Sequence, residues 1–401
     1  MPAPVDLLTL SFAEMGSFLA ALEWPRYRTA QVLRWLYQRR VTEVDAMTDL
    51  SKRERVQLAQ RAAICSLNPT ESRAAEDGTL KFIFSLTDGN SIETVVIPDQ
   101  ERLTLCLSTQ VGCTLDCAFC LTGRMGLLRN LQPQEIVGQV LAVQRYLSRL
   151  AIAPAHPGPA ISPTLPKSAK IDFFSQGTGP FSPGALTNLV LMGMGEPLAN
   201  PESVEESIRR ITDRRWGLGF SPRRITLSTA GLAPRLNRVA DLGINLAVSL
   251  NATTEAQRNR LMPAANHAYS LKALLDACRK YPLKPRQRLT FEYVLLKNEN
   301  DSEDDALRLA HLVRNIRCKI NLIPFNEFPG SSFQRPSEDA ILRFQSIVTR
   351  RGLDVFIRKS KGREVLGACG QLGSLSPPLV RPLRKQPKRG APAPALASAP
   401  S

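Results

Sequence analysis

The stretch Leu103-Thr-Leu-Cys-Leu-Ser108 is an apolar run of strand length, and a polar loop follows it. It is the first of several such runs that alternate with amphipathic helical patterns. The further strands are expected at 188–192, 224–228, 244–250, 289–296, 319–325 and 354–358, and the helices at 134–150, 270–281, 302–316 and 338–351. Parallel strands need crossover helices, so the sequence predicts an α/β fold with a complete or partial (β/α) barrel. Functional residues are then expected at the carboxyl ends of the strands.

Residues 1–90 are expected to form a small accessory domain ahead of a catalytic domain at 91–372. Pro25 can begin a helix whose apolar positions recur at helical spacing. Strands at 81–85 and 91–97, separated by Asp88-Gly89-Asn90, predict a β-hairpin that links the two parts. The helix after Pro25 has two interpretations: it is an ordinary solvated helix, or it belongs to an accessory RNA-binding domain.

Two segments do not fit the alternation. Residues from about 151 to 186 are rich in Pro, Gly, Ser and Ala, which predicts a disordered surface insertion. Residues 373–401 are expected to form a disordered basic tail.

The 401 residues contain 52 Lys and Arg against 36 Asp and Glu, a formal net charge of +16. Such a surplus indicates a polyanionic partner. Residues 1–90 carry 11 basic and 11 acidic side chains, so most of the surplus belongs to the expected catalytic domain. No apolar run has the length of about 20 residues that a membrane span needs. A cytoplasmic protein without membrane contact is expected, and its eight cysteines are too few for a disulfide scaffold.

Three cysteines stand close together in Cys113-Thr-Leu-Asp-Cys117-Ala-Phe-Cys120, on the loop after the first strand. A structural zinc site and a complete iron–sulfur electron carrier both use four protein ligands. Three thiols therefore indicate a metal centre with one position left for a substrate or cofactor. A zinc site with Cys106 or a distant Cys or His as fourth ligand is the alternative.

The spacing C-x-x-x-C-x-x-C, with Phe119 before the last cysteine, resembles the signature of radical S-adenosylmethionine (SAM) enzymes. Further motifs resemble the RlmN/Cfr family of radical SAM RNA methyltransferases: Ser108-Thr-Gln-Val-Gly-Cys113, Thr122-Gly123, Arg129-Asn-Leu131, Met192-Gly-Met-Gly-Glu-Pro-Leu198, Leu227-Ser-Thr-Ala-Gly231, Ile323-Pro-Phe-Asn326 and Ala368-Cys-Gly-Gln-Leu372. An ordered set of this kind is far more specific than one cysteine motif.

The resemblance implies cofactors and the residues that bind them. Cys113, Cys117 and Cys120 would bind a single 4Fe-4S cluster, and SAM would complete its coordination. The SAM-binding positions of the family correspond to Gly195, Glu196, Ser228, Ser249, Leu250, Asn251 and Asn326. Taken singly, each of these polar residues would more often be a cap or a turn residue.

The resemblance also implies a catalytic cysteine. Cys369 would be methylated by one SAM molecule, and a radical made from a second SAM would activate its methyl group for addition to an adenine carbon. Glu93 corresponds to the family's proton acceptor. Cys106 corresponds to the thiol that releases the RNA by forming a disulfide with Cys369.

The overall resemblance favours the branch that methylates carbon 2 of adenosine in the peptidyl-transferase centre of 23S rRNA and in tRNA next to the anticodon. Methylation at carbon 8, an antibiotic-resistance activity, is the nearest alternative. A non-catalytic, metal-stabilised RNA-binding protein is the alternative from another class. The family further implies flavodoxin or ferredoxin as the electron donor, and a monomer is expected.

Overall fold

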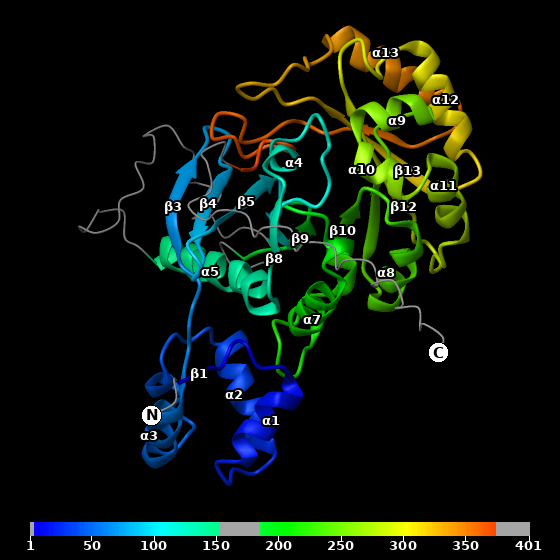
Figure 1. The fold of residues 1–401 in the computed structure, drawn as a ribbon. Helices are drawn as coiled ribbons and strands as arrows, with labels where there is room; N and C mark the ends of the chain where they lie inside the picture. Colours follow the sequence, from blue (N-terminus) through cyan, green and yellow to red (C-terminus); the bar gives the residue numbers. More distant parts are fainter. Residues whose placement is uncertain (1–3, 153–184, 374–401) are drawn as a thin grey trace, which may run out of the picture.

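The computed structural model describes residues 4–152 and 185–373, and its main feature is one ten-stranded sheet (Figure 1). The predicted insertion lies largely, and the predicted tail almost wholly, outside these residues. In spatial order the strands are β14 (Val355–Ile357), β13 (Cys318–Pro324), β12 (Leu289–Leu295), β11 (Asn245–Ser249), β10 (Ile225–Thr229), β9 (Asn188–Leu191), β6 (Arg102–Cys106), β5 (Ser91–Asp99), β4 (Leu80–Ser85) and β3 (Pro69–Ala74).

The seven strands expected for the barrel are present, and they are β6 and β9 to β14. Each is parallel to its neighbour, in the order of the chain. The sheet does not close, because β14 and β3 lie at opposite edges of it. The prediction of a partial barrel is therefore confirmed.

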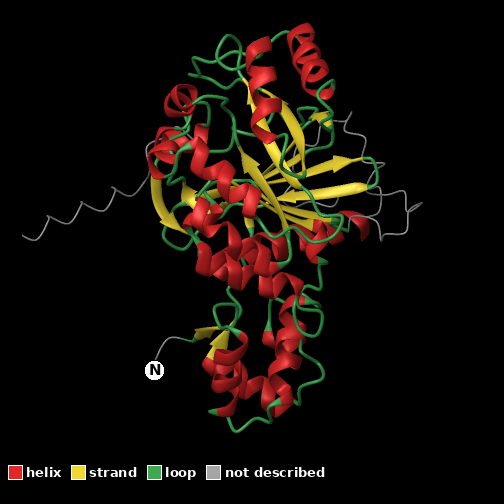
Figure 2. Ribbon diagram, turned by 90° about the vertical axis from the view of Figure 1, so that its right-hand side faces the viewer, coloured by secondary structure: helices red, strands yellow, loops and turns green. Residues whose placement is uncertain are grey.

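Amphipathic helices connect the parallel strands, and most of them lie along the same side of the sheet in Figure 2. The four helices expected from periodicity are α5 (Pro133–Ile152), α11 (Leu271–Lys280), α12 (Glu303–Val313) and α13 (Glu338–Thr349). Serine hydroxyls cap the first turns of α11, α12 and α13. The remaining crossovers include α7 (Pro201–Thr212), α8 (Leu236–Leu242), α9 (Glu255–Leu261) and α10 (Pro263–Ala268).

The predicted hairpin forms, but it is not a linker between two separate parts. β4 and β5 pair with each other, and β5 pairs antiparallel with β6, so the hairpin extends the main sheet. Local alternation predicts two strands and a turn, but it does not show which third strand they join. The division of the chain near residue 90 stays a prediction.

The residues before β3 form a helical unit that projects from the sheet in Figure 1. It contains α1 (Phe12–Ala20), α2 (Tyr27–Tyr37), α3 (Lys52–Arg61) and a two-stranded sheet of β1 (Val5–Asp6) and β2 (Ala62–Ala63). The helix expected after Pro25 is α2, and Leu33, Leu36 and Tyr37 are buried in it.

A buried arginine of α7 joins this unit to the sheet. Arg210 is 1% exposed and donates hydrogen bonds to the carbonyls of Leu8 and Thr9 and to the Tyr37 hydroxyl. Glu206 compensates its charge, with 2.8 Å between the Glu206 carboxylate and Nε of Arg210. The helical unit is thus held by hydrogen bonds from a desolvated guanidinium whose charge is paired with Glu206.

Among the residues that the structure describes, no helix is long and apolar enough to span a bilayer.

Replacing Arg210 should loosen the helical unit. The Arg210→Ala variant leaves two carbonyls without their donor and Glu206 with only Arg209 as partner, and we expect the docked state to lose about 3 kcal/mol. Amide hydrogen exchange within α1 and α2 should then rise. Arg209→Ala removes the exposed second partner of Glu206 on the same helix and is the matched control. Unchanged exchange in Arg210→Ala would show that this contact does not hold the unit.

Candidate active site

A cavity of about 160 Å³ opens at the carboxyl ends of the parallel strands. The loop that follows β6 forms one wall of this cavity, and β9 to β13 supply residues for the other walls. The predicted site residues that line it are Cys113, Cys117, Cys120, Gly195, Glu196, Ser228, Ser249, Asn251 and Cys369. Sequence positions up to 256 residues apart thus meet in one space, as the barrel topology requires.

The cysteine loop is held from outside the cavity by α9 and α10. The Ala118 N–H donates to the carbonyl of Leu261 at 3.0 Å, and the Ala264 N–H donates to Oδ1 of Asp116 at 3.0 Å. Burial raises the pKa of the Cys113 thiol to about 12 and that of Cys117 well above its usual value, and the neighbouring thiols act in the same direction. A buried metal centre would offset this cost, because it binds thiolates.

Gln110 joins the cysteine loop to the loop after β9. Its side chain accepts from the N–H groups of Thr114 and Glu196, at 3.1 and 2.9 Å, and donates to Thr114 and Asn130. Gly195 passes so close that an added Cβ would lie 2.5 Å from Cβ of Gln110, and its φ of +101° also favours glycine. The Gly195-Glu196 motif therefore has a structural reason in this chain.

The Glu196 side chain is 3% exposed at the cavity wall. It accepts the N–H groups of Ala230 at 2.8 Å and Leu198 at 3.0 Å. Burial raises the pKa of this carboxyl above its usual value, although the two N–H groups act in the opposite direction. A carboxylate of this kind is suited to an ammonium ligand, which would supply the missing positive charge.

A carboxylate that the motifs did not indicate stands on β12. Glu292 lines the cavity, is 5% exposed and accepts the Ser228 hydroxyl at 2.8 Å, while Ser249 lies 3.3 Å from Ser228. Oε1 of Glu292 has no hydrogen bond within the described structure, and its ion pair with Arg358 is long at 3.8 Å. Such an oxygen can accept a ligand hydroxyl. In the sequence, Glu292 could have been noticed as the single charged residue within the apolar run 289–296.

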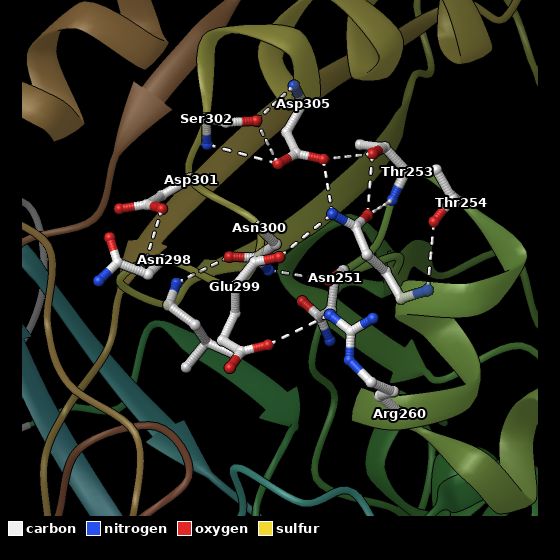
Figure 3. A network of polar contacts seen from close by, with 12 residues as sticks. Asn251, Thr253, Thr254, Arg260, Asn298, Glu299, Asn300, Asp301, Ser302 and Asp305 are labelled. Carbon is white, nitrogen blue, oxygen red and sulfur yellow. Dashed lines mark hydrogen bonds and ion pairs between the residues drawn. The ribbon is translucent and has the colours of Figure 1, made fainter.

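Asn251 is fixed by a buried network at the end of β11 (Figure 3). Its φ is +54°, and its Oδ1 accepts the Val294 N–H at 2.8 Å. Asn300, fully buried, donates to the carbonyls of Asn251 and Val294 and accepts the N–H of Leu296. These bonds hold a backbone conformation that a non-glycine residue seldom adopts.

Cys369 lies in an exposed loop at the cavity rim, and the Nδ2 of Asn326 donates to its carbonyl at 3.2 Å. Asn326 lines a second, smaller cavity of about 30 Å³ beside Cys369, together with Arg358, Lys359 and Lys361. Oδ1 of Asn326 has no partner among the described residues. Leu250 does not line the main cavity: its side chain is buried in the hydrophobic core, and its backbone forms hydrogen bonds with the Glu292 carbonyl and Arg258.

Cys106 is buried at the end of β6, and its thiol is free, as is that of Cys369. Burial raises the pKa of Cys106 to about 12, and the Cys369 sulfur is near enough to add to the shift. The Arg358 guanidinium acts in the opposite direction on both thiols. The two cysteines therefore share one electrostatic environment.

Glu93 is not on the cavity wall. Its carboxylate is 2.8 Å from the ammonium of Lys81 and also accepts the Gly373 N–H at 2.8 Å. Gly373 belongs to the same C-terminal loop as Cys369, so Glu93 contacts the loop that carries this cysteine. Its role as a proton acceptor stays a prediction.

The donor set fits the expected cofactors. Three thiols share one cavity with a buried carboxylate and with serine and asparagine side chains. Within the described ranges, no group of three or more His, Cys, Asp and Glu side chains is placed to hold a single metal ion. A cluster of several iron atoms spaces its ligands more widely than one ion does, and the cavity can accommodate ligand atoms beside the thiols.

Comparison with known proteins identifies the class. Residues 182–310 match the radical SAM superfamily. A radical SAM methyltransferase from Sphaerobacter thermophilus superposes with a TM-score of 0.79 at 39% identity, over 92% of this chain and 99% of that one. The open barrel with three thiols at its strand ends is thus that of a radical SAM methyltransferase.

The family is equally clear. Residues 5–64 match the N-terminal domain of ribosomal RNA large subunit methyltransferases. The dual-specificity RNA methyltransferase RlmN of Syntrophotalea carbinolica is 43% identical, over 96% of each chain, and that of Geobacter sulfurreducens is 44% identical, over 93% of each. The chain belongs to the RlmN family. The predicted 4Fe-4S cluster and SAM are confirmed as cofactors by this membership, and a non-catalytic RNA-binding protein is not favoured.

Loss of the Asn300 amide should weaken SAM binding. Asn300→Ala removes the bonds that hold Asn251 at a positive φ, so the SAM affinity measured by anaerobic calorimetry should fall about tenfold, which corresponds to about 1.4 kcal/mol. Lys297→Ala, an exposed change on the same loop, is the control. Equal affinities in the two variants would show that Asn251 is not positioned by this network.

Proposed function

We propose that this chain methylates carbon 2 of adenosine, in the peptidyl-transferase centre of 23S rRNA and in tRNA next to the anticodon, with Cys369 as the methyl carrier. The observation that carries the proposal is the position of Cys369, an exposed residue on the wall of the cavity that the three-cysteine loop also lines. The names of the relatives support two RNA substrates.

A cysteine carrier answers a chemical difficulty. Carbon 2 of adenine is electron-poor, so it cannot attack the methyl group of SAM. The Cys369 thiolate can attack it: the sulfur–methyl bond forms, the bond to the sulfonium of SAM breaks, and S-adenosylhomocysteine leaves. When bound, the cluster and a second SAM supply the radical chemistry that activates this methyl group.

Addition to the ring leaves RNA and protein joined through Cys369, and two further groups of the chain complete the reaction. Glu93 is the proposed acceptor of the ring proton, and the unpaired electron left by the addition would pass to the bound cluster. Cys106 is the proposed resolving thiol: a sulfur–sulfur bond to Cys369 forms, the carbon–sulfur bond to the RNA breaks, and a proton completes the methyl group. A thiol reductant would then return the disulfide to two thiols. The shared environment of the two thiols supports this role.

The RNA is proposed to lie across the mouth of the barrel. The basic run Arg358-Lys-Ser-Lys-Gly-Arg363 precedes Cys369, and its first four residues line the small cavity beside that thiol. Contacts between these basic side chains and RNA phosphates would supply salt-dependent affinity for the RNA. Residues 1–90, which include the helical unit and carry no net charge, would recognise the shape of the RNA. We further propose flavodoxin or ferredoxin as the reductant, a monomeric enzyme and a cytoplasmic location.

The regiochemistry can be tested in a host that lacks its own carbon-2 adenosine methylation. Expression of this chain should produce 2-methyladenosine in 23S rRNA and tRNA, detected by nucleoside mass spectrometry. Cys65→Ala, a change at an exposed cysteine outside the cavity, should leave the product unchanged. The appearance of 8-methyladenosine in its place would overturn the proposal.

The two cysteine roles predict opposite failures. Cys369→Ala should yield neither methylated RNA nor a methylated protein, because the carrier sulfur is lost. Cys106→Ala should still add to RNA but not release it, so a covalent RNA–protein adduct should accumulate on denaturing gels. Methylation by Cys369→Ala would contradict the carrier role, and absence of an adduct in Cys106→Ala would remove the resolving role.

A further inference from the structure

Arg258 of α9 is a buried cation without a carboxylate partner. Its side chain is 0% exposed, and its two terminal nitrogens donate to the carbonyls of Leu250, at 2.7 Å, and Ala230. Its Nε has no partner, and no ion pair includes Arg258 in the part of the chain that the structure describes. Glu255, one turn earlier, favours the charged form of Arg258 but forms no ion pair with it, and its carboxylate accepts the Lys272 N–H.

An uncompensated buried charge is costly. Carbonyl oxygens satisfy the N–H groups of a guanidinium but do not neutralise it, and the loss of hydration disfavours the charged form. Arg210, the other described arginine with almost no exposure, has the Glu206 carboxylate at 2.8 Å. Arg258 has no such carboxylate. This difference indicates that a negatively charged group lies beside Arg258 when the cofactors are bound.

The loop that carries the three cysteines contacts the end of α9, the helix to which Arg258 belongs. The Leu261 carbonyl, at the end of α9, accepts the N–H of Ala118, the residue after Cys117. A terminal nitrogen of Arg258 also lies 3.9 Å from the sulfur of Met262, which lines the cavity together with the three thiols. Arg258 also donates to the carbonyl of Ala230, and the N–H of Ala230 donates to Glu196. Arg258 therefore contacts the backbone that positions the buried carboxylate of the cavity.

We propose that Arg258 is the built-in counter-charge of the 4Fe-4S cluster, and that it raises the reduction potential of this centre. The inference rests on the proposed role of Cys113, Cys117 and Cys120 as ligands and is independent of the RNA substrate. A cluster bound by three thiolates gains one more negative charge on reduction, and a desolvated cation beside it stabilises that charge.

The midpoint potential of the cluster tests this role. The intact enzyme is reduced stepwise with dithionite, without RNA, and the reduced cluster is measured by electron paramagnetic resonance. Arg258→Gln keeps a donor but removes the charge, so its potential should shift to a more negative value. Arg258→Lys keeps the charge and should stay close to the wild type. Arg260→Gln, an exposed change two residues along α9, is the matched control and should not shift.

The outcomes are distinct. Equal potentials in the wild type, Arg258→Gln and Arg258→Lys would overturn the proposal, and so would loss of the cluster from Arg258→Lys, because the charge is then present without effect. Loss of iron from Arg258→Gln with retention in Arg258→Lys would support the counter-charge role. A wild-type chain without a cluster, or a Cys113→Ala variant that retains a complete one, would instead count against the proposed ligands.

Discussion

The site depends on one side chain, the amide of Gln110. It is fully buried, and its oxygen accepts N–H groups from two loops, at Thr114 beside the first cysteine and at Glu196. These loops follow different strands, β6 and β9, which are neighbours only because the sheet is parallel there. An amide can satisfy both loops without a charge, whereas a carboxylate could not also donate to Thr114 and Asn130. The position of the thiols relative to Glu196 follows from this bond pattern.

The main cavity and the smaller cavity beside Cys369 contain polar groups that folding alone would not favour. Glu196 and Glu292 are buried carboxyls, and Glu292 and Asn326 each have an oxygen without a hydrogen bond among the described residues. Burial of such groups lowers stability, because water no longer solvates them. Their location at the strand ends, beside three thiols, is explained by ligands that would pair with them. The positive φ of Asn251 belongs to the same pattern of local strain at a site.

The sequence predicted the parts of the fold that local periodicity controls. The seven strands and four helices were found because apolar spacing is a property of neighbouring residues. The place of the β4–β5 hairpin in the sheet was not found, since it depends on pairing with β6. Nine of the site residues predicted from motifs lie on the wall of the main cavity. Gln110 lies within a recognised motif, but its role depends on contacts 86 positions away, and the Glu93–Lys81 pair likewise became visible only across two strands.

The two fully buried arginines show why burial by itself does not distinguish structural from functional charges. Arg210 is paired with Glu206 and holds the helical unit against α7 with hydrogen bonds to two carbonyls. Arg258 also binds two carbonyls, but the chain provides it with no ion pair within the described residues. A protein that can pair one arginine can pair another, so the difference lies in what each charge faces. Arg210 is enclosed by protein groups, and its partner is a side chain. Arg258 lies one turn before the Leu261 carbonyl that binds the thiol loop, and its proposed partner is the cluster.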